Sequence, residues 1–104
     1  MKGDETMAKY MALWEMDTSR TPEDPKAKKA QHLSFLEIVA TQIKDGIIKD
    51  WGVFAGEGSG FVVVEGNAVK LHTLLAMWSP FVRFKTRESL TVSEAIKANK
   101  ALPE

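Results

Sequence analysis

The chain of 104 residues carries 14 basic and 14 acidic side chains, 44% hydrophobic residues, two histidines and no cysteine. This length fits one domain with one core, the balanced charge offers no concentrated positive surface for nucleic acid, and the lack of cysteine excludes disulfides, thiolate nucleophiles and cysteine-based zinc sites. No apolar run approaches the ~20 residues that a membrane-spanning helix needs, so we expect a cytoplasmic protein with no metal, no other cofactor, and neither nucleic acid nor membrane as a partner.

The amino-terminal segment "MKGDETM", residues 1–7, is polar and predicts a disordered leader before a single domain at residues 8–104. Residues 8–17, "AKYMALWEMD", are rich in aromatic and aliphatic side chains, which is typical of a strand. Side chains alternate between the two faces of a strand. Both faces of this strand are therefore apolar, the first formed by Tyr10, Ala12, Trp14 and Met16 and the second by Met11 and Leu13.

Residues 25–45 follow a proline-rich loop and have the spacing of a helix. Pro25 suits the first turn of that helix, and Gly46 suits a left-handed cap after its last turn. We expect one apolar stripe to face the core, consisting of Leu33, Leu36, Val39, Ala40 and Ile43.

The segment "IIKDWGVFAGE", residues 47–57, predicts a second strand, and "GFVVVEG", residues 60–66, predicts a third. The glycines between them raise the question of a nucleotide-binding loop. A dinucleotide fingerprint places G-x-G-x-x-G directly before a helix, whereas here the spacing is G-x-G-x-G and a strand follows. We therefore interpret these glycines as the turn of a central β-hairpin.

A second helix is predicted after Asn67, a good capping residue. Its apolar stripe comprises Ala68, Leu71, Leu74, Leu75 and Trp78, and Ser79-Pro80 ends it because the residue before proline avoids helical geometry.

A fourth strand and a short helix complete the chain. The strand is "FVRFKT", residues 81–86, with Val82 and Phe84 on one face and Arg83 on the other. Thr91 and Glu94 then have the spacing of a capping box and begin the helix in "TVSEAIKANKAL".

The order β-α-β-β-α-β predicts an α+β, ferredoxin-like fold, a four-stranded antiparallel sheet with the two long helices on one face, plus a short C-terminal helix. The other face of the sheet is left uncovered although it carries apolar side chains. Monomers avoid large exposed apolar patches. We therefore expect a homodimer in which two sheets pack face to face.

The phrase "LLAMWSPFVRFKTRESLTVSEAI", the order of elements and the two-faced strands resemble the dimeric α/β-barrel superfamily, over about residues 9–96. The resemblance is strongest to small single-domain members whose second helix ends in a tryptophan. The superfamily includes cofactor-free monooxygenases, lactone isomerases, haem enzymes and ligand-sensing domains. This sequence matches none of their catalytic sets residue by residue, so the resemblance implies a fold and a homodimer but no activity.

His32 is the candidate catalytic residue, because helical spacing places it within the apolar stripe, one turn before Leu36 and two turns before Val39. An imidazole at the edge of a core can transfer protons or donate a hydrogen bond to a ligand. The alternative is a histidine that only packs at the margin of the stripe.

Tyr10, Trp14 and Trp51 are candidate ligand-binding residues, since large aromatic side chains line pockets for planar apolar molecules. The alternative is that they form ordinary core or dimer interface. Arg83 is a further candidate, because its guanidinium can hold a carboxylate with two hydrogen bonds. Its alternatives are a pair with Glu15 or Asp50 across the sheet, or an exposed edge position.

These residues support three hypotheses. In the first, a homodimer binds a small apolar or aromatic molecule between sheet and helices. In the second, the domain is a cofactor-independent monooxygenase or isomerase that uses His32 for proton transfer. In the third, it is a protein-interaction module whose exposed helices contact a partner.

Overall fold

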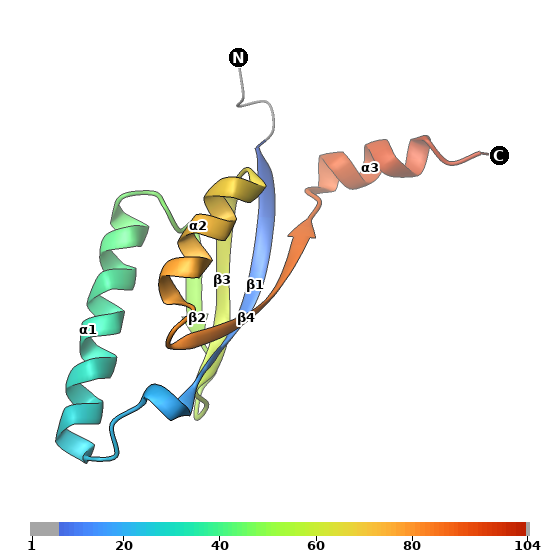
Figure 1. The fold of residues 1–104 in the computed structure, drawn as a ribbon. Coiled ribbons are helices and arrows are strands. Elements are labelled where there is room, and N and C mark those ends of the chain that lie inside the picture. Colours follow the sequence, from blue (N-terminus) through green and yellow to red (C-terminus); the bar gives the residue numbers. More distant parts are fainter. Residues whose placement is uncertain (1–6, 104) are drawn as a thin grey trace.

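The computed structural model describes residues 7–103 (Figure 1). Residues 1–6 of the expected disordered leader lie outside the described residues. The predicted α+β, ferredoxin-like order is confirmed, with a 3₁₀ turn (η2) added after the first strand: β1 (Ala8–Met16), η2 (Thr18–Arg20), α1 (Pro25–Lys44), β2 (Asp50–Val53), β3 (Ser59–Gly66), α2 (Ala68–Trp78), β4 (Val82–Ser89) and α3 (Val92–Lys100).

The four strands form one antiparallel sheet in the order β2-β3-β1-β4. One face carries the predicted set of Ala12 and Trp14 together with Val62 and Val64, and these residues are buried in the core under the helices. The other, which we call the open face, carries Met11 and Leu13, which are 44% and 46% exposed. The predicted two-faced character of β1 is therefore confirmed.

Side-chain caps fix where the helices begin. The carboxylate of Asp24 accepts a hydrogen bond from the backbone N–H of Ala27 at 2.9 Å, and Pro25 occupies the first turn of α1. Asn67 caps α2 in the same way. At α3 the predicted capping box is confirmed, with Thr91 and Glu94 bonded to each other's backbone.

Two strands differ in length from their predictions. β2 is confined to Asp50–Val53 because the amides of Ile47 and Ile48 bond instead to the Gln42 carbonyl at the end of α1. Beyond β2, the Glu57 amide bonds to the Phe54 carbonyl and closes the hairpin turn, as the glycines predicted. β4 extends to Ser89 because it pairs with β1 along its whole length.

The predicted core stripe of α1 is wrong for most of its members. Leu33, Leu36 and Ile43 are 54%, 47% and 42% exposed, and within α1 only Val39 and Gln42 are buried. These two residues and the half-buried His32 and Phe35 share one side of α1, which we call its inner stripe. The helix is thus rotated so that a mixed stripe faces the sheet, while Leu33 and Ile43 face outward and Leu36 is half-exposed beside the cavity described below. In α2 the prediction holds, because Leu71 and Leu74 are buried.

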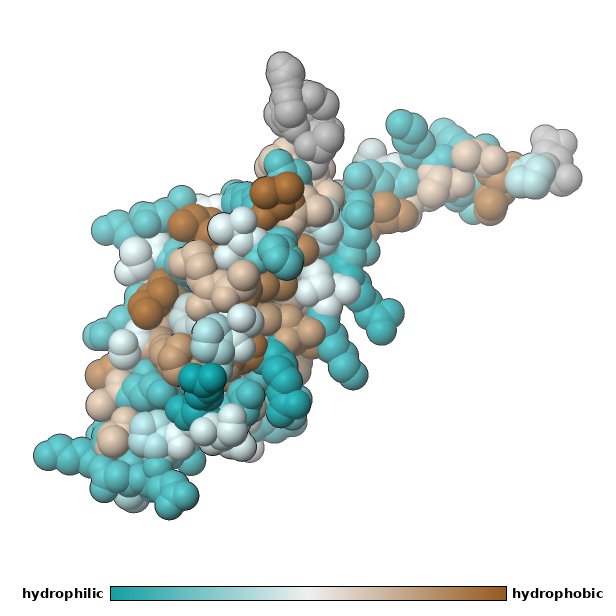
Figure 2. All heavy atoms as spheres, viewed as in Figure 1, coloured by the Kyte–Doolittle hydropathy of each residue, from teal (hydrophilic) through white to brown (hydrophobic). Residues whose placement is uncertain are grey.

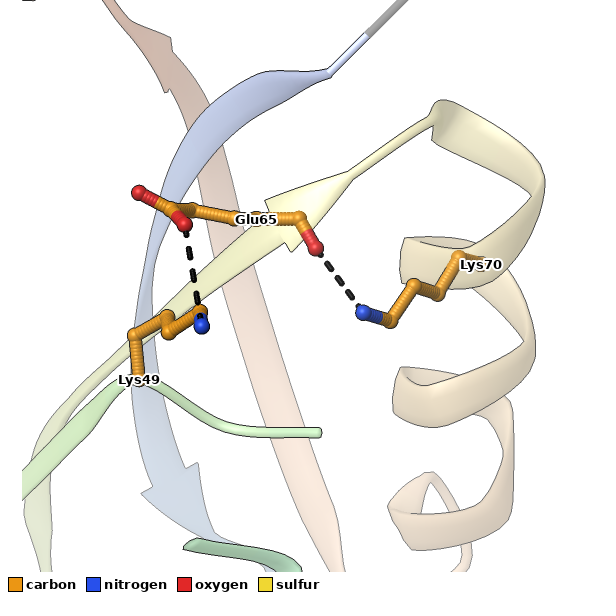
Figure 3. Close-up of polar contacts among 3 residues, drawn as sticks. All are labelled: Lys49, Glu65 and Lys70. Carbon is orange, nitrogen blue, oxygen red and sulfur yellow. Dashed lines mark hydrogen bonds and ion pairs between the residues drawn. The ribbon is translucent and has the colours of Figure 1, made fainter. Parts of the chain in front are cut away.

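The end of β3 is held from both sides (Figure 3). On the open face, Lys49 Nζ lies 3.9 Å from the carboxylate of Glu65. On the other side, Lys70 Nζ of α2 donates a hydrogen bond to the Glu65 carbonyl oxygen at 2.9 Å. These contacts join β3 to the entry of β2 and to the first turn of α2.

The molecule is elongated, with a radius of gyration of 16.6 Å and extents of 60 × 31 × 20 Å. A compact chain of this length has a radius of gyration of ~13 Å. The difference arises from α3, which leaves the end of β4 and projects away from α1 and α2 (Figure 1). All its described residues are exposed, so α3 does not cover the open face.

Candidate functional site

A cavity of about 230 Å³ lies between α1 and the helix-facing side of the sheet, and α2 forms one of its walls. It is partly open to solvent. Four strands contribute one or two side chains each, and the hairpin turn contributes Glu57 and Gly58 at the rim. From α1, the cavity is lined by His32, Phe35, Leu36 and Val39.

Trp14 and Trp51 form the aromatic side of this pocket. Their rings are stacked, with centroids 5.5 Å apart and planes 13° apart. The Trp14 indole N–H donates a hydrogen bond to the Phe61 carbonyl oxygen at 3.3 Å, so its polar group is satisfied and its flat surface is left for packing. Directly across from Trp14, β3 has Gly60, whose missing side chain leaves room for the indole ring.

The opposite wall comes from α1 and α2. His32, Phe35 and Val39 face the cavity from α1, and Trp78 faces it from α2. Phe35 packs edge-on against Trp78 with centroids 5.5 Å apart, which joins the two helices over the sheet. Phe35 and Trp78 were not among the predicted binding residues. The spacing of Phe35 three residues after His32 is the signal that would have found it.

Polar groups are few in the cavity. Among the described residues that line it, the ionisable side chains are those of His32 and Glu57. His32 is half-buried on α1, and Glu57 is exposed at the hairpin, where its carboxylate accepts a hydrogen bond from the Ser59 hydroxyl at 2.8 Å. The site can thus offer one imidazole to a ligand within otherwise apolar surroundings.

Tyr10 and Arg83 lie outside this pocket. Tyr10 is on the helix-facing side of β1 and packs against the core. Arg83 is exposed on the open face of β4, directly across from Glu15. The structure therefore brings together Trp14, Trp51 and His32 and separates the other two predicted residues from them.

Arg83 also has a local electrostatic role. The pKa of Asp17 is lowered, first by hydrogen bonds from the Ser19 hydroxyl and amide and then by the positive charges of Arg83 and Arg20. Asp17 caps η2 at the end of β1, so the charge of Arg83 acts on this turn and not on the pocket.

Residues 7–103 contain neither a cluster of metal-ligating side chains nor a membrane-spanning helix. No group of three or more histidine or carboxylate side chains lies in an arrangement that could hold a metal ion there. Nor is any described helix long and apolar enough to cross a membrane.

The whole described fold corresponds to one known family. The profile of the family described as "Domain of unknown function (DUF3303)" matches residues 8–103. The chain belongs to this family. The DUF3303 match runs from β1 past α3, so it contains both the pocket and the open face. No curated protein and no solved structure matches the sequence significantly.

Proposed function

We propose that this DUF3303 domain binds a small apolar or aromatic molecule in the pocket between the sheet and the helices. The observation that carries this proposal is the cavity of about 230 Å³ beside the stacked Trp14 and Trp51. An apolar cavity of ~150 Å³ is enough to hold benzene, so this one suits a molecule of one or two aromatic rings. A ring with a single polar substituent fits best, because His32 is the polar group inside the walls.

Binding is tested with one- and two-ring aromatic compounds, beginning with indole and 1-naphthol. We expect a rise in melting temperature, since a ligand that binds only the folded state stabilises it. We also expect saturable quenching of tryptophan fluorescence, because Trp14 and Trp51 line the cavity. Compounds of this class that change neither signal at millimolar concentration would contradict the proposal.

A matched pair of variants on α1 locates the site. Leu36 lines the cavity, whereas Ile38, which is 44% exposed, does not. Leu36→Trp should fill the cavity and weaken binding at least about tenfold, or ~1.4 kcal/mol. Ile38→Trp adds the same ring to the same helix and should leave the affinity unchanged. Equal effects of the two substitutions would place the ligand elsewhere.

A cofactor-independent monooxygenase or isomerase is the second candidate, and the position of His32 on the pocket wall favours it. In that function His32 would accept a proton from the bound molecule. His32→Ala should then abolish turnover while the compound still binds. Unchanged turnover in this variant would reject His32 as the catalytic group.

We also infer a homodimer of the dimeric α/β-barrel kind, formed by two open faces. Its support is the exposure of Met11 and Leu13 in the middle of the sheet, where burial of each would contribute roughly 1.5–3 kcal/mol. Light scattering coupled to gel filtration should give twice the monomer mass. Leu13→Glu should give a monomer, and Val69→Glu, on the exposed surface of α2, should remain a dimer.

A protein-interaction module is the third candidate, and α3 favours it. Its apolar residues Val92 and Ile96 lie one turn apart and are both exposed. Figure 2 shows hydrophobic side chains along α3 as well as over α1 and α2, interrupted by hydrophilic ones. A nine-residue helix is marginal in water without packing. This candidate places a partner on α3 and leaves the pocket without a role.

A further inference from the structure

The charges on the open face indicate how two copies would meet. We propose that the sheets of the homodimer pack with β4 of each protomer over β2 of its partner, held by ion pairs between Arg87 of one protomer and Asp50 of the other. This inference rests on the homodimer proposed above. It adds the relative orientation of the two sheets and the residues that select it.

The open face has an apolar centre, a cationic flank on β4, and the single carboxylate of Asp50 on β2. Its centre consists of Met11 and Leu13 of β1 with Phe61 and Val63 of β3. The β4 flank presents a row of three cations at alternate positions, Arg83, Lys85 and Arg87, all exposed.

The β2 flank is different. It presents the carboxylate of Asp50, then Gly52, which lies under the Phe61 ring. Asp50 pairs with Val63, Val63 with Met11, and Met11 with Arg87. Asp50 and Arg87 therefore lie at the same level on opposite edges of the sheet.

Symmetry leaves two aligned arrangements for two such faces. Packed sheets commonly keep their strand directions within about 30° of each other, so the twofold axis runs nearly parallel or nearly perpendicular to the strands. An axis parallel to the strands places β4 over the partner's β2 and keeps each level, so Arg87 meets the partner's Asp50. A perpendicular axis places β4 over the partner's β4, so two rows of three cations face each other.

Like charges brought together in an interface oppose association, whereas complementary ones favour it. The parallel axis is therefore selected.

The parallel axis also places Lys9 of β1 opposite the partner's Glu65, since these two residues lie at one level on β1 and β3. Glu65 already has Lys49 beside it at 3.9 Å (Figure 3). Asp50 has no cation within 4 Å among the described residues, and its carboxylate only accepts a hydrogen bond from the Trp51 amide, so it is the stronger partner for a new pair.

Charge reversal at the two positions tests the arrangement. In the Arg87→Glu homodimer both contacts become acid against acid, and in the Asp50→Lys homodimer both become cation against cation. Each variant alone should dissociate at least about tenfold more readily than the wild type. A mixture of the two restores an opposite-charge pair at both contacts, so it should form a heterodimer. Native mass spectrometry detects this species when one variant carries a tag of distinct mass.

A control for the charge change lies outside the open face. Lys29→Glu, on the exposed surface of α1, makes the same charge change away from the open face and should leave the dimer unchanged. If β4 instead packed over the partner's β4, Arg87→Glu would strengthen its own homodimer and Asp50→Lys would leave dimer affinity unchanged. Either result overturns the proposal. A mixture of the two variants that yields no heterodimer overturns it as well. A monomeric wild type overturns the homodimer itself, whereas a wild-type dimer with indifferent variants overturns only this orientation.

Discussion

At the scale of single residues, the shape of the pocket depends on a position that has no side chain. Gly60 lies opposite Trp14 in the sheet, and a Cβ added there would overlap the Gly52 carbonyl oxygen and approach the Trp14 ring. The carbonyl belongs to the backbone of β2 and cannot turn aside as a flexible side chain can. The place of Trp14 beside Trp51 therefore requires glycine at position 60.

Gly60→Ala should destabilise the domain by about 1–3 kcal/mol, the cost of overpacking a filled site. The matched control is Gly58→Ala, because a Cβ at Gly58 would have its nearest neighbour at 3.9 Å, an ordinary contact. We expect the control to change the free energy of unfolding by no more than about 0.5 kcal/mol. Urea denaturation monitored by tryptophan fluorescence gives both values. Equal stabilities of the two variants would show that the Gly52 carbonyl and the Trp14 ring both move away without cost.

At the scale of elements, α1 and α3 both expose apolar side chains, for different reasons. α1 carries two adjacent stripes of side chains with helical spacing. The stripe that meets the sheet ends in the buried Gln42, whereas the other ends in an isoleucine. It packs through Phe35 and Val39 and leaves the cavity beside them. α3 has a complete capping box but no buried residue, so local hydrogen bonds define it while tertiary contacts do not.

A chain truncated after Ser89 tests whether α3 contributes to the stability of the domain. Because α3 has no buried residue, its removal should lower the free energy of unfolding by no more than about 0.5 kcal/mol. The comparison is made by urea denaturation in the Leu13→Glu background, so that dimer contacts do not enter the result. A larger loss would mean that α3 packs against its own protomer in solution.

At the scale of the whole molecule, the pocket and the open face lie on opposite sides of one sheet. Trp14 faces the pocket, and its neighbours Leu13 and Glu15 face away from it. We therefore expect the proposed ligand binding and the proposed dimerisation to be separable.

We expect Leu13→Glu to bind indole or 1-naphthol as tightly as the wild type, and Leu36→Trp to keep the dimeric mass. Titration calorimetry and light scattering measure the two properties on the same samples. If the Leu13→Glu monomer binds more than about tenfold more weakly, the partner protomer shapes the pocket and the two sites are coupled.

The sequence alone determined the order and type of the elements, because local signals fix them. Alternation of side chains defined the two faces of β1, proline, asparagine and the Thr91–Glu94 pair marked where helices begin, and the glycines after β2 marked the hairpin. Trp14 and Trp51 were also recognisable as candidates from their residue type and strand position. Each of these inferences depends on residues close together in the chain.

Only the tertiary structure decided which stripe of α1 meets the sheet, that Trp14 and Trp51 stack, and that Arg83 lies on the face opposite His32. Periodicity gives the spacing of a helical stripe but not the rotation of the helix. It therefore predicts that the more apolar stripe faces the core, whereas the stripe through Phe35 packs inward. The stacking of the tryptophans depends on the order β2-β3-β1-β4 and on the gap at Gly60. Such contacts join residues far apart in sequence, and their geometry exists only once the sheet has formed.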